Sequence, residues 1–448
     1  MFAFLDRKHT VAAPNHNRWL IPPAALAIHL AIGQVYAFSV FNLPLTRVLG
    51  VSESVPGDWR LTDIGWIFSI AIVFLGLSAA LFGKWLEREG PRKAMFFSAL
   101  CFSGGFFVSA LGVYLHQIWL LYLGYGVLGG IGLGIGYISP VSTLIKWFPD
   151  RPGMATGLAI MGFGGGAMIG SPLAVSLLGR FGSEASVGVW ETMLVMGTLY
   201  FFLMMIGVFL VRVPADGWKP AGWVPAENNG NKMITNNHVN ADEALKTPQF
   251  WLLWVMLMVN VTAGIGILSQ ASPMIQEMFP GSVTPESAAF FVALLSFFNL
   301  IGRFLWSSFS DKIGRKVVYG IYFGLGLTLY AAVPSLGSLS TEFWFIAACA
   351  VIMTMYGGGF ATIPAYLRDL FGTFQVGAIH GRLLTAWSTA GILGPVLVNY
   401  IRQMQIDAGV PAAQAYSVTM YIMAGLLLIG FLCNLAVKEV NKRHHMKF

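Results

Sequence analysis

The chain has 448 residues, of which 56% are hydrophobic and only 10% are charged, and its mean hydropathy is +0.69. A water-soluble protein needs about 25% charged residues to cover its surface, so this composition excludes an ordinary soluble protein. The formal net charge of +7 comes from basic residues scattered through short loops, which argues against nucleic acid as a partner.

Twelve apolar runs are long enough to cross a bilayer, which takes about 20 predominantly apolar residues per helix. The polar start of the chain lacks a cleavable signal pattern, so the first run is expected to act as its own insertion signal. The runs are too long and unbroken for the alternating strands of a membrane barrel. The sequence therefore predicts an all-α polytopic membrane protein, with spans at 19–43, 62–82, 94–115, 118–145, 153–178, 189–211, 249–275, 287–309, 317–337, 342–366, 377–401 and 415–437.

Basic residues set the predicted orientation, because Lys and Arg gather in cytoplasmic loops. With both termini in the cytoplasm, most of the 27 Lys and Arg residues fall on the cytoplasmic side, as in the loops 84–93 and 312–316. Under the same assignment, all 20 acidic residues are expected in loops or at helix ends. Arg303 is the one charge predicted at hydrocarbon depth; the basic residues on the outer side are Arg47, Arg60, Arg180 and Arg402.

The two halves of the chain repeat each other. Glu87 and Gly90 recur 224 residues later as Asp311 and Gly314, and the same offset relates Pro140 to Pro364, Gly153 to Gly377 and Gly157 to Gly381. We therefore predict two six-helix bundles related by a pseudo-twofold axis, at 1–211 and 248–448. The polar segment 212–247, which contains three prolines and the run Asn228–Asn231, is predicted to be a cytoplasmic linker.

The repeated loops carry a family resemblance. Residues 83–93, GKWLEREGPRK, resemble the loop signature G-x3-D-R-x-G-R-R/K of the major facilitator superfamily, with Glu for Asp and an added Pro. A second copy lies at 307–316, SSFSDKIGRK. The resemblance implies a binding cavity near the membrane midplane and transport by alternating access.

These loops are also candidates for gating. An acid followed by basic residues at a helix end can pair with the dipole of a neighbouring helix and hold one conformation. The alternative is that the basic residues only orient the protein. The candidate gating residues are Glu87, Arg88, Arg92, Asp311, Lys312 and Arg315.

Three further stretches resemble the oxalate/formate antiporter family, a group similar to monocarboxylate transporters. They read GQVYAFSVF at 33–41, NLIGR at 299–303 and GRLLTAW at 381–387. In that family, members that bind dicarboxylates use an Arg in span eight and a Lys in span eleven. Arg303 matches the first position, but Trp387 stands at the second.

The change from Lys to Trp387 bears on the substrate. Two cations can neutralise a dianion such as oxalate, whereas one Arg leaves it half compensated at low dielectric. One guanidinium suits one carboxylate, through two parallel hydrogen bonds. We therefore expect Arg303 to bind a small monocarboxylate such as lactate, pyruvate or formate. The repeat places Ala79 opposite Arg303, so this charge is not a symmetric structural element, although an Arg paired with backbone carbonyls is the alternative.

Other site candidates follow from the family resemblance or from residue type. Gln34, Tyr36, Tyr356 and Phe360 match positions that line the family's cavity, and packing is the competing interpretation for each aromatic ring. Asn299 is a polar residue in an apolar span. His29 in span one is the candidate proton-coupling group, with a packing histidine as the alternative. Glycine runs at 129–136 and 162–170 predict close helix packing rather than phosphate binding.

The sequence thus predicts a secondary transporter of small organic anions, monomeric, in a bacterial inner membrane, without a cofactor or metal. Its three cysteines lie alone in separate apolar runs. The alternatives are a dicarboxylate exchanger of the oxalate/formate type and a proton-coupled efflux pump for amphipathic compounds. Against the pump, the Gly-Pro motif expected in span five is broken at Gly170-Ser171-Pro172. An enzyme is disfavoured because no nucleophile–base pair appears in the spans.

Overall fold

The computed structural model describes residues 3–13, 15–223, 233–336 and 342–446. Within these ranges the chain is helical, with isolated β-bridges but no strand. Twelve helical segments of the described residues are long and apolar enough to cross a membrane, which confirms the predicted fold class. They are Arg18–Leu45, Thr62–Glu89, Pro91–Tyr114, Ile118–Trp147, Pro152–Phe181, Val189–Leu210, Pro248–Leu268, Phe290–Ile313, Arg315–Leu336, Glu342–Phe371, Val376–Asp407 and Ser417–Ala436.

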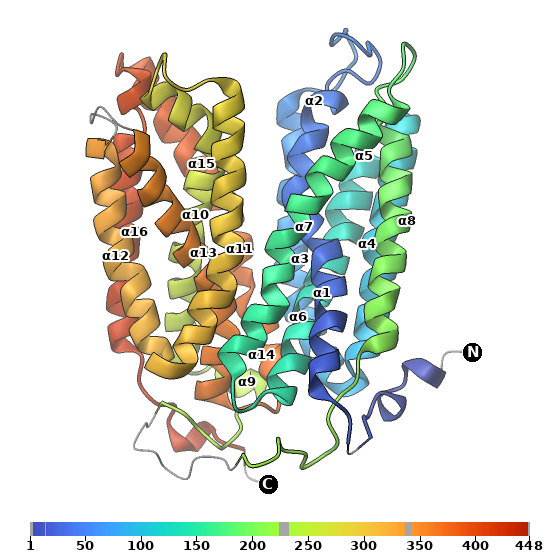
Figure 1. Cartoon of the computed structure of the whole chain (residues 1–448), viewed down its shortest axis with the longest axis vertical. Coiled ribbons are helices and arrows are strands. Elements are labelled where there is room, and N and C mark those ends of the chain that lie inside the picture. The colour runs from blue at the N-terminus through green and yellow to red at the C-terminus, as the bar shows by residue number, and fades with distance from the viewer. Residues whose placement is uncertain (1–2, 14, 224–232, 337–341, 447–448) are drawn as a thin grey trace. The chain divides into compact units, whose positions relative to one another are not determined.

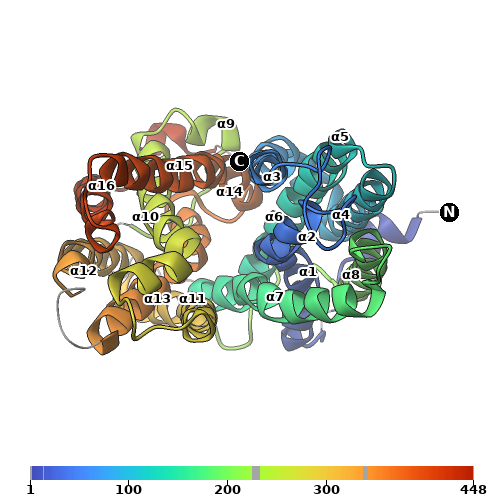
Figure 2. The same cartoon turned by 90° about the horizontal axis from the view of Figure 1, so that it is seen from above.

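The chain forms two compact units, and unit 1 contains residues 1–150, 158–226 and 375–388. In Figures 1 and 2 its long helices run beside one another, with α4 against α8 and α3 against α6. A short helix from late in the chain, α14 (Val376–Leu383), packs against α3. The helices of unit 1 are α1 (Ile21–Ile32), α2 (Asn42–Leu45), α3 (Leu61–Glu89), α4 (Pro91–Tyr114), α5 (Ile118–Leu121), α6 (Gly130–Trp147), most of α7 (Pro152–Phe181), α8 (Val189–Leu210) and α14.

Unit 2 contains residues 151–157, 227–374 and 389–448, so the first turns of α7 belong to it. Its most extensive helix packing is between α11 and α13 and between α12 and α16. The predicted bundles at 1–211 and 248–448 stay a prediction, and residues 224–232 of the predicted linker, including Asn228–Asn231, lie outside the described ranges. The helices of unit 2 are α9 (Ala241–Ala244), α10 (Pro248–Met278), α11 (Pro285–Ile313), α12 (Arg315–Leu336), α13 (Glu342–Phe371), most of α15 (Thr385–Asp407) and α16 (Ser417–Ala436).

The repeated loop motifs lie on helix ends rather than in open loops. Helix α3 continues past the predicted end at 82 to Glu89, so Glu87 is in its last turn, and α11 likewise carries Asp311 to its end at Ile313. Each helix then stops at a glycine with positive φ, 94° at Gly90 and 90° at Gly314. Only glycine adopts such a conformation without steric cost, which explains why both copies of the motif keep it.

Two spans of unit 1 depart from α-helical geometry. In span one, α1 passes into the 3₁₀ segment η4 (Gly33–Phe41), and in span four, α5 passes into the π-helical segment η5 (Tyr122–Gly129). The ring centroid of Phe38 in η4 lies 4.4 Å from that of Tyr125 in η5. Such segments often mark functional hinges, and neither was visible in the apolar sequence pattern.

Glycines allow the helices of unit 1 to approach closely, as their runs predicted. A Cβ atom on Gly33 would overlap the carbonyl of Phe163 in α7. A Cβ on Gly166 would overlap the backbone at Leu30 and Gly33. The glycines of the run at 162–170 therefore let α7 lie against span one, backbone to backbone.

Candidate functional site

Arg303 lies in the middle of α11 and is fully buried in unit 2. Its Nε donates a hydrogen bond to Oδ1 of Asn299, at 3.1 Å, one helical turn earlier. Its guanidinium carbon lies 5.3 Å from the centroid of the Phe360 ring on α13. Arg303, Asn299 and Phe360, each predicted separately, therefore form one cluster, in which the aromatic face stabilises the cation.

A close approach of two helices makes this cluster possible. At Gly357 of α13, an added Cβ would overlap the backbone of Asn299 and lie 3.1 Å from Cγ of Arg303. At Gly302 of α11, it would overlap the backbone of Thr354. Because neither glycine carries a side chain, the stem of Arg303 packs directly on the α13 backbone.

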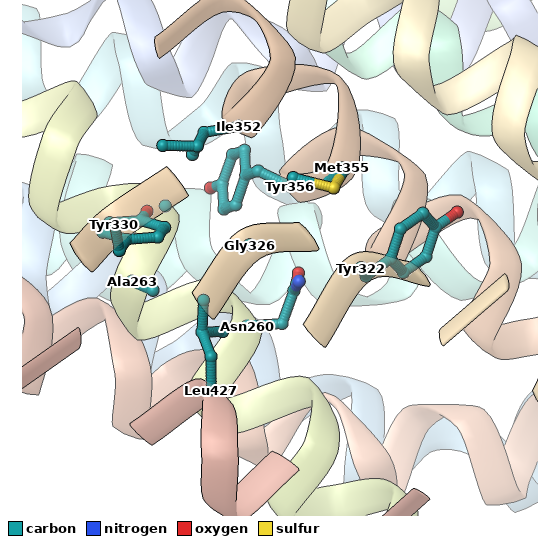
Figure 3. Close-up of a pocket in the computed structure, with 10 residues that line it drawn as sticks. Asn260, Ala263, Tyr322, Gly326, Tyr330, Ile352, Met355, Tyr356 and Leu427 are labelled. Carbon is teal, nitrogen blue, oxygen red and sulfur yellow. The ribbon is translucent and has the colours of Figure 1, made fainter. Parts of the chain in front are cut away.

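Tyr356 lies one turn before Phe360 on the same helix, and the two rings are 5.4 Å apart and nearly perpendicular. Tyr356 also lines a small cavity inside unit 2, together with Asn260 and Tyr330 (Figure 3). Tyr356 is therefore a buried neighbour of the arginine cluster.

The candidates on span one lie in unit 1. Oε1 of Gln34 accepts a hydrogen bond from the Tyr125 hydroxyl at 2.9 Å, and both side chains are fully buried. Tyr36 instead packs into an aromatic cluster, 5.3 Å from Phe163 and 6.3 Å from Trp387. Gln34 thus fixes the 3₁₀ segment to the π-helical segment, while Tyr36 contacts the tryptophan that replaces the family's Lys.

Trp387 is fully buried among rings from three helices of unit 1. Its ring centroid lies 5.4 Å from that of Tyr137 in α6 and 5.5 Å from that of Phe163 in α7. Tyr137 is in turn 5.8 Å from His380 of α14. Trp387 is therefore part of an aromatic core, which explains how this position accommodates a large apolar ring.

His29 extends the same cluster from span one. Its ring stacks on Tyr137 at 5.2 Å, with an interplanar angle of 19°. Nδ1 lies 2.7 Å from the carbonyl oxygen of Ala159, and Nε2 lies 3.1 Å from that of Tyr137. Since carbonyl oxygens only accept, both contacts are hydrogen bonds only when the ring carries a proton on each nitrogen.

The acid of the first repeat, Glu87, caps a helix. Its Oε1 accepts a hydrogen bond from the backbone N–H of Gly377, at 2.9 Å, in the first turn of α14. Its Oε2 accepts from Nζ of Lys146 in α6, at 2.5 Å. The carboxylate is therefore held by a neighbouring cation and by the positive end of a helix dipole.

The acid of the second repeat, Asp311, does the same in unit 2. Its two oxygens accept hydrogen bonds from the backbone N–H groups of Gly153 and Met154 in the first turn of α7, each at 2.8 Å. Oδ1 also accepts from Arg315, at 2.6 Å. Nε of Arg315 in turn donates to Asp369 of α13, at 3.1 Å.

The other candidate gating residues divide by exposure. Arg315 is buried between its two carboxylates, whereas Lys312 is exposed. Arg88 is exposed and pairs with Glu89 beside it. Arg92 is buried but holds the N-terminal segment, donating to the carbonyl oxygens of Phe4, His9 and Val211.

Several site residues were missed by sequence reasoning. The sequence analysis does not single out Lys146 or Asp369, although they lie in similar stretches, Lys146-Trp147-Phe148 and Arg368-Asp369-Leu370-Phe371, that follow the two repeated prolines. Their nearly matching positions were the signal for their ion pairs. Tyr137 and Phe163 gave no signal, because aromatic residues are common in apolar spans. Among the described residues, no three His, Cys, Asp or Glu side chains gather as a metal site.

Comparison with known proteins places the chain in a family. The profile of the Major Facilitator Superfamily matches residues 24–395. The chain is 27% identical over 382 residues to the oxalate:formate antiporter of Oxalobacter formigenes, covering 84% of this chain and 83% of that protein. It is 24% identical over 394 residues to human monocarboxylate transporter 11, covering 86% and 77%.

Solved structures agree on the fold. The fucose:proton symporter FucP of Escherichia coli superposes with a TM-score of 0.66 at 14% identity, covering 94% of this chain and 99% of that one. The chain belongs to the major facilitator superfamily. Because the members of this family are transporters, the protein is a transporter rather than an enzyme.

The ion pairs around Arg315 predict that replacing Arg315 destabilises the protein far more than replacing Lys312, the other basic residue compared in the same motif. Arg315→Gln removes the cation from between Asp311 and Asp369, and stranding buried charges costs about 3–5 kcal/mol. Lys312→Gln, at an exposed position, should change stability by less than about 0.5 kcal/mol. Unfolding of the two purified variants in detergent measures the difference, and equal stabilities would contradict the assigned role of Arg315.

Proposed function

We propose that this protein moves small organic anions, with monocarboxylates such as lactate, pyruvate or formate as substrates, by alternating access. The observation that carries the proposal is Arg303, a fully buried guanidinium in the middle of a membrane span. A charge at this depth is costly, so it is kept where it has a function. Similarity to an oxalate:formate antiporter and to monocarboxylate transporters supports the same substrate class.

The charges of the described cluster favour a substrate with one carboxylate. Asn299 fixes Nε of Arg303, and Phe360 offers its ring face to the guanidinium. A guanidinium held in this way binds a carboxylate through two parallel hydrogen bonds. Trp387 replaces the family's second cation and is packed among aromatic rings. A dicarboxylate exchanger is the competing candidate, supported by the 27% identity to the oxalate:formate antiporter.

We further propose that the transporter acts as a monomer in a bacterial inner membrane with both termini in the cytoplasm. The distribution of Lys and Arg supports this orientation. The similarity to a bacterial antiporter supports the choice of membrane.

Removing the cation tests the binding role. Arg303→Gln should weaken carboxylate binding by about thirtyfold or more, because losing one partner of a buried charge pair costs about 2–5 kcal/mol. Uptake of labelled lactate and formate into proteoliposomes gives the change in KM. Arg180→Gln, which removes an exposed Arg, is the matched control. Normal uptake by a correctly inserted Arg303→Gln protein would exclude this role.

We also propose that Glu87 and Asp311 are gating residues. Each carboxylate caps the first turn of a helix that belongs, by sequence, to the other repeat. Breaking the Glu87 contact loses a backbone hydrogen bond and an ion pair, and breaking the Asp311 contact loses two backbone hydrogen bonds. These contacts therefore favour the conformation in which they form. Lys146 and Arg315 support the two acids as their cationic partners.

Neutralising these acids should slow transport while leaving insertion intact. Glu87→Gln and Asp311→Asn each lose charge-assisted hydrogen bonds worth about 1.5–3 kcal/mol, enough to lower the maximal uptake rate by about tenfold. Glu89→Gln is the control, because this neighbouring acid pairs with Arg88 and Lys93, two basic residues of its own loop region. If both variants transport at the normal rate, the gating role is wrong.

We propose His29 as the proton-coupling group, because histidine changes its charge between pH 5 and 8. The titratable side chains that face it are Tyr137 of α6, stacked on its ring, and His380 of α14 beyond Tyr137. Helix α7 contributes the Ala159 carbonyl and the Phe163 ring.

Coupling through His29 predicts a change in pH dependence. Lactate uptake by the wild type should vary between pH 5 and 8, and His29→Gln should abolish that variation, since glutamine does not titrate. His9→Gln, in the exposed N-terminal segment, should keep the wild-type profile. A wild-type profile in His29→Gln would show that the proton is carried elsewhere.

A further inference from the structure

Unit 2 contains a small cavity that the proposed role of Arg303 does not explain. Residues of α10, α12, α13 and α16 line it, among them Asn260, Tyr330, Met355 and Tyr356 (Figure 3). The space open to the centre of a water-sized sphere is about 10 Å³. A volume of this size holds one water molecule when polar groups are available to bind it.

Two buried polar atoms at this cavity lack partners. Oδ1 of Asn260 and the hydroxyl of Tyr330 have no hydrogen-bond partner within the described part of the chain. The side chains are almost completely enclosed, at 6% exposure for Asn260 and 2% for Tyr330. Asn260 also lies in a span, where the lipid offers no hydrogen bonds in place of the missing ones. Polar groups in such a position are normally bound to protein or to ordered water.

Glycines and close packing keep the cavity from being filled. Gly264 of α10 and Gly326 of α12 are among its lining residues. A Cβ atom on Gly264 would overlap the ring of Tyr356. Oδ1 of Asn260 lies against Gly359 of α13, where an added Cβ would overlap it. The glycines thus leave space among side chains that include the unpartnered Asn260.

We propose that this cavity is a binding site for a single water molecule held by Asn260 of α10. One O–H of the water donates to Oδ1 of Asn260, which otherwise has no partner in the described part of the chain. A metal cation is a poorer occupant, because the lining residues include no carboxylate to balance its charge. The ligand is therefore neutral, polar and the size of water.

The cavity is connected to the arginine cluster through Tyr356 and Phe360. Tyr356 lines the cavity and packs on Phe360 at 5.4 Å, and Phe360 faces the guanidinium of Arg303. The water would fill the space beside Tyr356 on the cavity side and so fix the position of the Phe360 ring. This positioning role rests on the proposed function of Arg303, whereas the water site does not.

Radiolytic hydroxyl-radical footprinting of the intact protein in lipid nanodiscs tests the proposal, because radicals formed from a bound water modify the side chains beside it. Met355 lines the cavity and Met353 does not, although both are buried in α13 at 2% and 0% exposure. We expect Met355 to be oxidised severalfold more than Met353. Equal oxidation of the two methionines in the wild type would overturn the proposal, and this comparison needs no variant.

Two further arms identify the occupant. Asn260→Leu should reduce the oxidation of Met355 to the level of Met353, whereas Arg303→Gln should leave it unchanged, so failure of the water site and failure of the transport proposal are distinguishable. Replacing Na⁺ and K⁺ by N-methylglucamine should also leave it unchanged. A loss of the Met355 signal in that buffer would assign the cavity to a cation and contradict the water site.

Discussion

The low dielectric of the bilayer is the constraint on which this structure depends, because every charge inside the protein must have a prepared environment. Arg303 has Asn299 at its Nε and the face of Phe360 beside its guanidinium. The acids of the two repeated motifs lie instead at helix ends, where backbone N–H groups receive them. Helix packing at glycines makes these arrangements possible, since side chains there would hold the helices apart. The environments of the charged groups therefore depend on the small residues at the helix contacts.

The two repeats solve the same electrostatic problem with different residues. In unit 1, Glu87 takes its cation from Lys146, which follows the repeated Pro140 within α6. In unit 2, Asp311 takes its cation from Arg315 in its own motif, and Arg315 binds a second acid, Asp369. The geometry at the helix N-terminus is kept, while the source of the counter-charge changes. This pattern indicates that the capped helix, rather than any particular ion pair, is the feature that both repeats preserve.

Sequence reasoning predicted the twelve spans well because the length and apolarity of a membrane helix are local properties of the sequence. It also predicted that Arg303 would be buried at membrane depth and that glycine runs would pack closely. It did not predict the 3₁₀ turn at Gln34 or the π-helical turn at Tyr125, because these depend on how two spans meet. The aromatic cluster around Trp387 was likewise invisible, since Tyr137 and Phe163 lie in apolar runs where any ring would be ordinary. The repeat placed the two motif acids in corresponding positions, but their partners required coordinates.

The central claim is that one guanidinium, without a second cation at Trp387, selects anions with a single carboxylate. Uptake of labelled lactate, formate and oxalate by the wild-type protein in proteoliposomes, with and without an internal counter-anion, tests it most directly. The account predicts that lactate or formate is transported and that oxalate is transported far more slowly under both conditions. Transport of oxalate in preference to both monocarboxylates, or transport of none of the three, would contradict it.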